Sequence, residues 1–190
     1  MILLLEANGK RSVNKNENGM AIDFCRKFIE NESFAKIYCY TEQERIMTSL
    51  DIVFGYDATS ICERMTALLA ARDFELIPHY CGSKIGLMEY LASRKKCDWL
   101  ILPERMPSGP YKASDLVWLH EEYNVNIIPL LTTERIGTDY MRDLYCGGIL
   151  TAEFPGRVTE SQLPDVLVTL ILRGRSHETA KVYYRVADVK

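Results

Sequence analysis

Short apolar runs alternate with amphipathic segments along most of the chain. Five apolar runs predict strands, at residues 51–57, 74–80, 97–103, 125–131 and 148–154. The segments between and after them place apolar residues at helical spacing and predict helices, at residues 58–73, 84–96, 112–124, 138–145 and 162–175. Because these strands are apolar almost throughout, they are typical of a parallel sheet that helices cover on both faces. The pattern therefore predicts an α/β protein, a three-layer sandwich with a mainly parallel sheet.

The two ends of the chain carry a weaker pattern. Apolar runs predict strands at 2–6 and 34–40, with helices at 20–32 and 41–50, while the polar stretch 8–19 is rich in Asn and Gly and predicts a loop. We therefore expect residues 1–50 to form a β-α-β extension of the same sheet, ahead of a core at 51–175. Residues 176–190 are predicted to form an edge strand or a tether.

Composition and charge narrow the class of protein. With 47% apolar and 26% charged residues among 190, the chain has the make-up of an ordinary globular protein with a substantial core. A formal charge of −3 argues against broad nucleic-acid binding, which normally needs a basic face. No apolar run reaches the roughly 18 residues that a membrane span needs, and no basic segment precedes the run in "MILLLEANG" as in a signal peptide. We expect a cytoplasmic protein that does not enter a membrane.

The cysteines and histidines carry no metal-site spacing. Six cysteines and three histidines are scattered along the chain without the close pairs that zinc sites use. Most of the cysteines lie in apolar segments, where a reduced thiol packs as a small hydrophobic group. We expect neither a metal site nor structural disulfides.

Polar residues at the predicted strand ends are the candidates for a binding site, because ligands of open α/β sheets bind there. Gly82, Ser83 and Lys84 stand at the start of a predicted helix, where free backbone amides could hold an anion, although glycines there also serve turn geometry alone. Asp57 and Glu104 could hold a divalent cation loosely, or Asp57 could simply cap the helix that follows it. Neither a dinucleotide fingerprint nor a P-loop motif is present.

Residues 51–175 resemble the receiver domain of response regulators. "CDWLILPERMPSG" is similar to the third strand and loop of that family, "VNIIPLLTT" to its fourth strand with a final Thr132 or Thr133, and "CGGILTAEF" to its fifth strand. The resemblance implies a flavodoxin-like core. The site residues of the family fall on a degenerate pocket in this chain, namely Asp57, Pro103, Glu104, Thr132 and Ala152.

The residues that would carry the family's chemistry are replaced. Pro103 stands in place of the phosphoacceptor aspartate and Ala152 in place of the lysine, while at most Asp57 remains of the acidic pair. Without the carboxylate no aspartyl phosphate forms, and without the lysine no cation stabilises it. The resemblance thus implies a non-phosphorylatable regulatory or adaptor module that needs no cofactor and acts through an unknown protein partner. It also implies a homodimer through the 140–172 surface, with candidate interface residues Tyr140, Leu144, Tyr145 and Leu167.

Two alternatives remain open. "KIYCYTEQE" and "LPERMPSG" also resemble parts of the serine recombinase catalytic domain, with Thr41 in place of the nucleophilic serine and Arg105 as an anion-stabilising base. Such a relative would act on DNA, but Thr is a poor substitute for the nucleophile. The other alternative is a small Rossmann-like enzyme of unknown substrate that uses Asp57, His79 and Glu104. One long helix through the Gly147–Gly148 pair would favour the recombinase, whereas a strand near 148–152 and a helix from about 161 would favour the receiver-like core.

Overall fold

The computed structural model describes residues 2–3, 39–40, 47–93 and 95–186. The chain divides into two compact units, Met1–Ile46 and Met47–Lys190. In the first unit β1 (Ile2–Leu3) pairs with β2 (Cys39–Tyr40) in an antiparallel two-stranded sheet. The loop predicted at 8–19 and the helix predicted at 20–32 lie outside the described residues, so the β-α-β extension stays a prediction.

The second unit is built on a parallel sheet. Its strands are β3 (Thr48–Phe54), β4 (Phe74–Tyr80), β5 (Trp99–Pro103) and β8 (Asn126–Leu130), in the spatial order β4-β3-β5-β8. Glu153 adds one parallel bridge to Leu130, which places the segment around it beside β8. Numbered along the chain, the order is 2-1-3-4-5, which is that of flavodoxin-like folds, receiver domains included.

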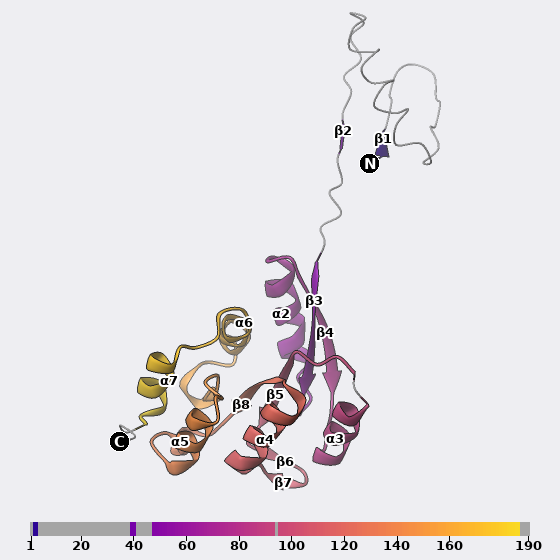
Figure 1. Ribbon diagram of the computed structural model, residues 1–190. Coiled ribbons are helices and arrows are strands. Elements are labelled where there is room, and N and C mark those ends of the chain that lie inside the picture. The colour runs from indigo at the N-terminus through magenta and orange to yellow at the C-terminus, as the bar shows by residue number, and fades with distance from the viewer. Residues whose placement is uncertain (1, 4–38, 41–46, 94, 187–190) are drawn as a thin grey trace, which may run out of the picture. The chain divides into compact units, whose positions relative to one another are not determined.

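Helices cover both faces of this sheet (Figure 1). On one face α2 (Thr59–Ala70) and α6 (Leu163–Arg173) pack over a cluster that includes Ile52 and Ile101. On the other face α3 (Lys84–Ala92), α4 (Ala113–Tyr123) and α5 (Asp139–Cys146) pack over a cluster that includes Val53 and Leu100. Neighbouring residues of one strand thus serve opposite cores, as a doubly covered strand requires. The predicted three-layer α/β fold is confirmed.

Three element predictions need correction. Residues 48–50, predicted as the end of a helix, belong to strand β3. The helix predicted at 84–96 ends at Ala92, with Ser93 as its C-cap, and Lys96 lies beyond it with its Nζ donating to the Ser49 carbonyl at 2.9 Å. Within the described residues, the fifth strand predicted at 148–154 is reduced to one parallel bridge, from Glu153 to Leu130.

The C-terminal segment is the fourth correction. Residues 177–184 form helix α7 (His177–Tyr184) and not an edge strand or a tether. Ser176 caps this helix, because its Oγ accepts the backbone N–H of Thr179 at 3.2 Å. Ala180 and Tyr184, four residues apart, are both fully buried. A cap and one buried helical stripe therefore outweigh the strand preference of a Val- and Tyr-rich segment.

The helix α5 ends before the glycine pair, as expected for the receiver-like core. Gly147 is its C-cap, and Gly148 has φ +78°, a conformation that suits glycine. A Cβ on Gly147 would lie 2.3 Å from Cγ2 of Val117 on α4, so only glycine fits there. The chain then runs on to the Glu153 bridge, the 3₁₀ turn η2 (Pro155–Arg157) and α6.

Side chains from α7 and its approach close the sheet edge beyond β8. The Ala152 N–H donates to the Tyr184 hydroxyl at 2.7 Å, and this hydroxyl donates to the Ile149 carbonyl at 3.1 Å. The Arg175 guanidinium donates to the Ala152 carbonyl at 2.8 Å. An edge normally leaves such backbone groups unpaired and open to another strand, so α7 takes the place of a neighbouring strand.

The opposite edge is β4. The Cys81 N–H bonds to the Phe54 carbonyl, so the residues at even positions of β4 turn their backbone groups away from β3. Pro78 is one of them and has no N–H to offer, which is the usual position for proline in a sheet.

We expect Tyr184→Phe to lower the free energy of unfolding by about 1–3 kcal/mol, because it leaves the buried Ala152 N–H and Ile149 carbonyl without their partner. Urea denaturation measures the change. Tyr145→Phe is the control, since its hydroxyl makes no hydrogen bond within the described part of the chain, and a loss equal to that control would contradict the edge-closing role.

Candidate functional site

The loop after β5 folds into a hairpin. β6 (Arg105–Met106) pairs antiparallel with β7 (Gly109–Pro110), and Gly109 has φ +106°, which glycine adopts readily. Met106 is buried, and the Tyr111 hydroxyl donates to its Sδ at 3.0 Å. The segment after β5, at the strand end where an open active-site loop was expected, is therefore a hairpin with a buried side chain.

Pro103 fills the space between the ends of β5 and β3. A Cβ on Gly55 would lie 2.9 Å from Cδ of Pro103 and 3.0 Å from Cδ2 of Leu102. Cβ atoms do not come that close to other atoms without a shift of one of them, so Gly55 is the residue that lets the Pro103 ring pack here. The packing leaves no room for an additional side chain between the two strand ends.

The Glu104 carboxylate is bound on both oxygens. Oε2 accepts the Thr132 N–H at 2.8 Å, and Oε1 accepts Nε of Arg135 at 2.7 Å in an ion pair. Burial acts to raise the pKa of Glu104, but the bonds from Thr132 and Arg135 outweigh it and lower the pKa. Glu104 thus ties β5 to η1 (Thr133–Arg135), the 3₁₀ turn after β8.

Asp57 stands directly before Ala58, the N-cap residue of α2, and bonds to the first residue of that helix. Its Oδ1 accepts the N–H of Thr59 at 3.2 Å and the hydroxyl of Thr59 at 2.7 Å, at the start of α2. These bonds lower the pKa of Asp57. Within the residues described, no group of three or more His, Cys, Asp or Glu side chains is placed to hold a metal ion. The capping interpretation of Asp57 therefore accounts for its contacts, and Glu104 is occupied elsewhere.

The candidate anion site is occupied by the protein's own groups. Ser83 caps α3, its Oγ accepting the Gly86 N–H at 3.0 Å. Lys84 Nζ donates to the Pro110 carbonyl at 2.6 Å and lies 4.3 Å from the centre of the Tyr111 ring. Gly82, the third member, is exposed. The glycine and serine thus serve the turn and the cap, and the lysine fastens α3 to the hairpin.

The position of Ala152 leads to a cluster that the sequence did not reveal. Ala152 is fully buried, and the next residue, Glu153, is only 1% exposed. Glu153 pairs with Arg175 at 3.0 Å and accepts the Tyr183 hydroxyl at 2.6 Å. Burial, followed by the bond to Glu153, raises the pKa of Tyr183 to about 12. A charge inside the apolar run "ILTAEF" was the one signal for this pair, and nothing local pointed to residue 175.

The candidate interface residues divide into two groups. Leu144 and Leu167 are fully buried in the two cores, so neither side chain is at the surface, and that part of the expectation is wrong. Tyr140 is half-buried and donates to the Tyr111 carbonyl at 3.3 Å. Tyr145 packs its ring against His177 of α7, with 5.5 Å between ring centres. The homodimer itself stays a prediction, which light scattering at high concentration tests.

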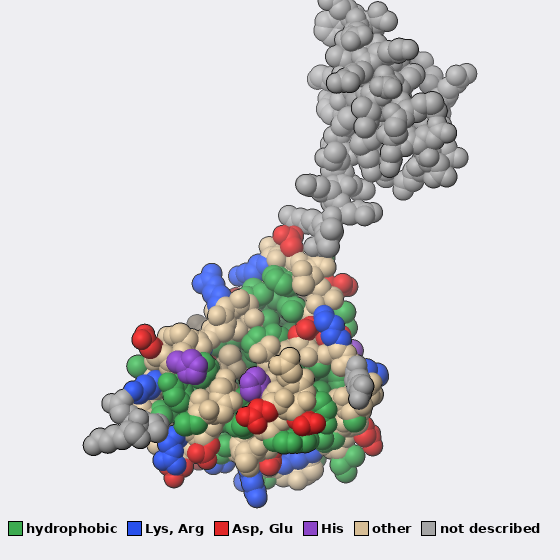
Figure 2. All heavy atoms as spheres, in the orientation of Figure 1, with side chains coloured by type: hydrophobic (Ala, Val, Ile, Leu, Met, Phe, Trp, Pro, Cys, Tyr) green, Lys and Arg blue, Asp and Glu red, His purple; other side chains and the backbone are tan. Residues whose placement is uncertain are grey.

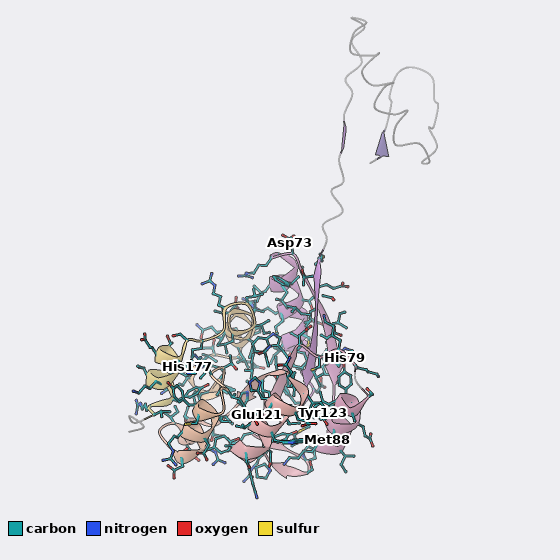
Figure 3. All side chains as sticks on the ribbon, viewed as in Figure 1. Asp73, His79, Met88, Glu121, Tyr123 and His177 are labelled. Atoms are coloured by element: carbon teal, nitrogen blue, oxygen red, sulfur yellow. The ribbon has the colours of Figure 1, made fainter. Side chains whose placement is uncertain are left out.

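The residues of the two alternative functions are not brought together. Thr41 lies outside the described residues, and Arg105 is exposed on β6. On the face shown in Figure 2, basic and acidic side chains are interspersed without a broad basic patch. His79, labelled beside β4 in Figure 3, pairs with Asp51 at 3.2 Å, whereas Glu104 pairs with Arg135. No described helix is long and apolar enough to cross a membrane.

Comparison with solved structures finds a likeness to a crystal structure titled as the signal receiver domain of an HD domain-containing protein from Pseudomonas fluorescens Pf-5. The match has 17% identity and a TM-score of 0.43, and it covers 68% of this chain and 90% of that one. A likeness this distant does not place the chain in a family, and the fold assignment rests on the strand order above. No family model and no curated protein matches the chain.

We expect Gly55→Ala to lower the free energy of unfolding by about 1–3 kcal/mol, because the new Cβ collides with Pro103 and Leu102. Adding Pro103→Ala removes one of the two colliding atoms, so the double variant is expected to lose less than the sum of the single losses. Urea denaturation of the four proteins gives the coupling. Gly82→Ala is the control, since a Cβ there meets nothing within 4 Å, and strictly additive losses would contradict the close packing.

We expect Glu104→Gln to cost about 1–3 kcal/mol at pH 7, because it removes the charge that binds Arg135 and the Thr132 N–H. The pKa of Glu104 is lower in the folded chain, so its contribution is complete above the unfolded value of about 4.3 and is lost as the pH falls through the folded value. The difference in free energy of unfolding between the wild type and the variant should therefore become smaller below about pH 4. Denaturation at a series of pH values measures it, with the exposed Glu63→Gln as control, and a constant difference would contradict the ion pair's role.

Proposed function

We propose that this chain is a receiver-like regulatory or adaptor module that is not phosphorylated and acts in the cytoplasm through protein contacts. The fold has the flavodoxin-like strand order, whose ligand site lies at the carboxyl ends of the strands. The observation that carries the proposal is the packing of Pro103 against Gly55 at that end. A closed apolar contact occupies the point where acyl phosphate chemistry would need a carboxylate nucleophile.

The charges around the strand ends support the same proposal. Transfer of a phosphoryl group needs cations that can meet the developing negative charge. Lys84 donates to the Pro110 carbonyl, Arg135 pairs with Glu104 and Arg175 pairs with Glu153. Each of these three cations is therefore already engaged by a protein group, and an anion would have to compete with that group for it.

The alternatives lack a supporting observation of this kind. α5 ends at Cys146 and α6 begins at Leu163, so the described residues do not contain the single long helix through the glycine pair that the recombinase interpretation requires. The three residues of the enzyme hypothesis each bind a different partner, as described above. A module whose strand-end site is closed would act through its exposed surface, and this supports partner binding as its activity.

We expect no acid-labile phosphate after the chain is incubated with acetyl phosphate and Mg²⁺. The physical reason is the absence of a nucleophilic carboxylate at residue 103 and the burial of Ala152 where a cation would be needed. Intact-mass spectrometry makes the measurement, with an active receiver domain that carries the aspartate as positive control. A phosphoryl adduct that hydroxylamine removes would contradict the proposal.

A further inference from the structure

A groove of about 270 Å³ runs between α3 and α4. Leu87, Tyr111 and Leu119 are buried beneath it. Met88 of α3 and Trp118 of α4 form its walls. The lining is thus mainly apolar, although the groove opens to solvent.

A large apolar side chain is exposed at this groove. Trp118, which lines it, is 47% exposed. Single exposed apolar residues are ordinary on any protein. A tryptophan beside an apolar groove is different, because tryptophan is among the residues that most often dominate binding energy in protein interfaces. Its ring is also held in place from one side, packing edge-on to Tyr123 with 5.8 Å between ring centres.

The rim of the groove is acidic. Asp115 and Glu122 stand three residues before and four residues after Trp118, which puts them on its face of α4, and Glu121 is adjacent. None of these three carboxylates forms an ion pair with another described residue, although Asp115 accepts the Lys112 N–H at 3.1 Å. Lys84, the cation in the lining, is bound to the Pro110 carbonyl. Figure 2 shows acidic side chains beside apolar ones over α4.

We propose that a basic amphipathic helix of a protein partner docks in the groove between α3 and α4. Its apolar stripe lies against Trp118 and Met88, and its lysine or arginine side chains face the acidic rim. This inference rests on the proposed function, because it names the surface through which an adaptor without strand-end chemistry acts.

The chemistry of the rim selects this occupant. Acidic groups repel anionic lipid and nucleic acid, and they repel the same acidic rim on a second copy of this chain. A basic helix, in contrast, supplies both the apolar stripe for the groove and cations for the carboxylates. The groove is small for a protein interface, so we expect an affinity on the order of micromolar.

The test uses the full chain and a fluorescein-labelled Lys/Leu peptide of about 18 residues with leucines at helical spacing. Fluorescence anisotropy measures its affinity, and amide chemical shifts locate the site. A Glu/Leu peptide with the same leucine positions serves as the charge-reversed probe. We expect micromolar binding of the Lys/Leu peptide with shifts on α3 and α4, weaker binding at high salt, and no binding of the Glu/Leu peptide.

Variants separate the groove from unspecific attraction. We expect E121K combined with E122K to weaken binding about tenfold or more, and Trp118→Ala to do the same while Trp118→Phe retains most of the affinity. The matched control is E63K combined with E160K, which changes the net charge equally at exposed positions of α2 and of the loop before α6. Circular dichroism and thermal unfolding confirm that each variant is folded.

Each contrary outcome overturns the docking proposal. Two of these concern the peptide: equal affinity in the groove variants and the control pair, and peptide-induced chemical shifts outside α3 and α4. The other two concern other occupants: binding of anionic phosphatidylserine vesicles at Trp118 that is tighter than binding of the Lys/Leu peptide, and self-association that maps to the groove. The phosphodonor assay reports on the strand ends alone. A phosphorylated chain that still binds the peptide at the groove would therefore overturn the proposed function and not the docking site, while an unphosphorylated chain without groove binding would do the reverse.

Discussion

The buried ion pair between Glu153 and Arg175 is the contact on which the C-terminal half of the molecule depends. Glu153 lies in the segment beside β8, and Arg175 lies between α6 and α7, so the pair joins the sheet to both helices. Removing one partner of a buried pair typically destabilises a protein by about 3–5 kcal/mol, since the other charge is left without compensation. The same guanidinium also binds the Ala152 carbonyl, and the same carboxylate binds Tyr183. One interaction therefore positions the last part of the sheet and the helix that covers it.

Side-chain contacts also join neighbouring elements at the carboxyl ends of the strands. Glu104 and Arg135 join β5 to the turn after β8, and Pro103 packs against Gly55 to join β5 to β3. In active enzymes of this architecture, strand ends keep polar groups ready for a ligand. Here Glu104 with Arg135, and Pro103 with Gly55, hold neighbouring strands together.

Sequence patterns predicted the central strands to within a few residues where burial on both faces dictated them, as in β5, whose first four residues are all buried. The edge strand at 74–80 was predicted with its observed bounds although only Leu76 is buried in it, because its run of apolar residues directly follows the predicted helix end at Asp73. The helix at 177–184 was missed because its cap and buried stripe involve only a few residues, whereas its composition favours a strand. Periodicity also identified Leu144 and Leu167 as apolar helix positions but did not tell core from surface. At the candidate site, a proline at the end of the strand, Pro103, was visible in the sequence. The pairs 104–135 and 153–175 were not, since each joins residues that only the fold brings together.

The closed edge beyond β8 also limits how copies of this unit can assemble. A strand of another molecule finds the backbone groups there already bound to Tyr184 and Arg175, so in the second unit β4 is left as the edge that can pair. With one usable edge on the four-stranded sheet, pairing of like edges is two-fold symmetric and ends after two molecules. Pro78 weakens even that contact, because it removes a donor from the middle of the strand. The sheet of this unit therefore cannot propagate into a fibre while α7 is in place.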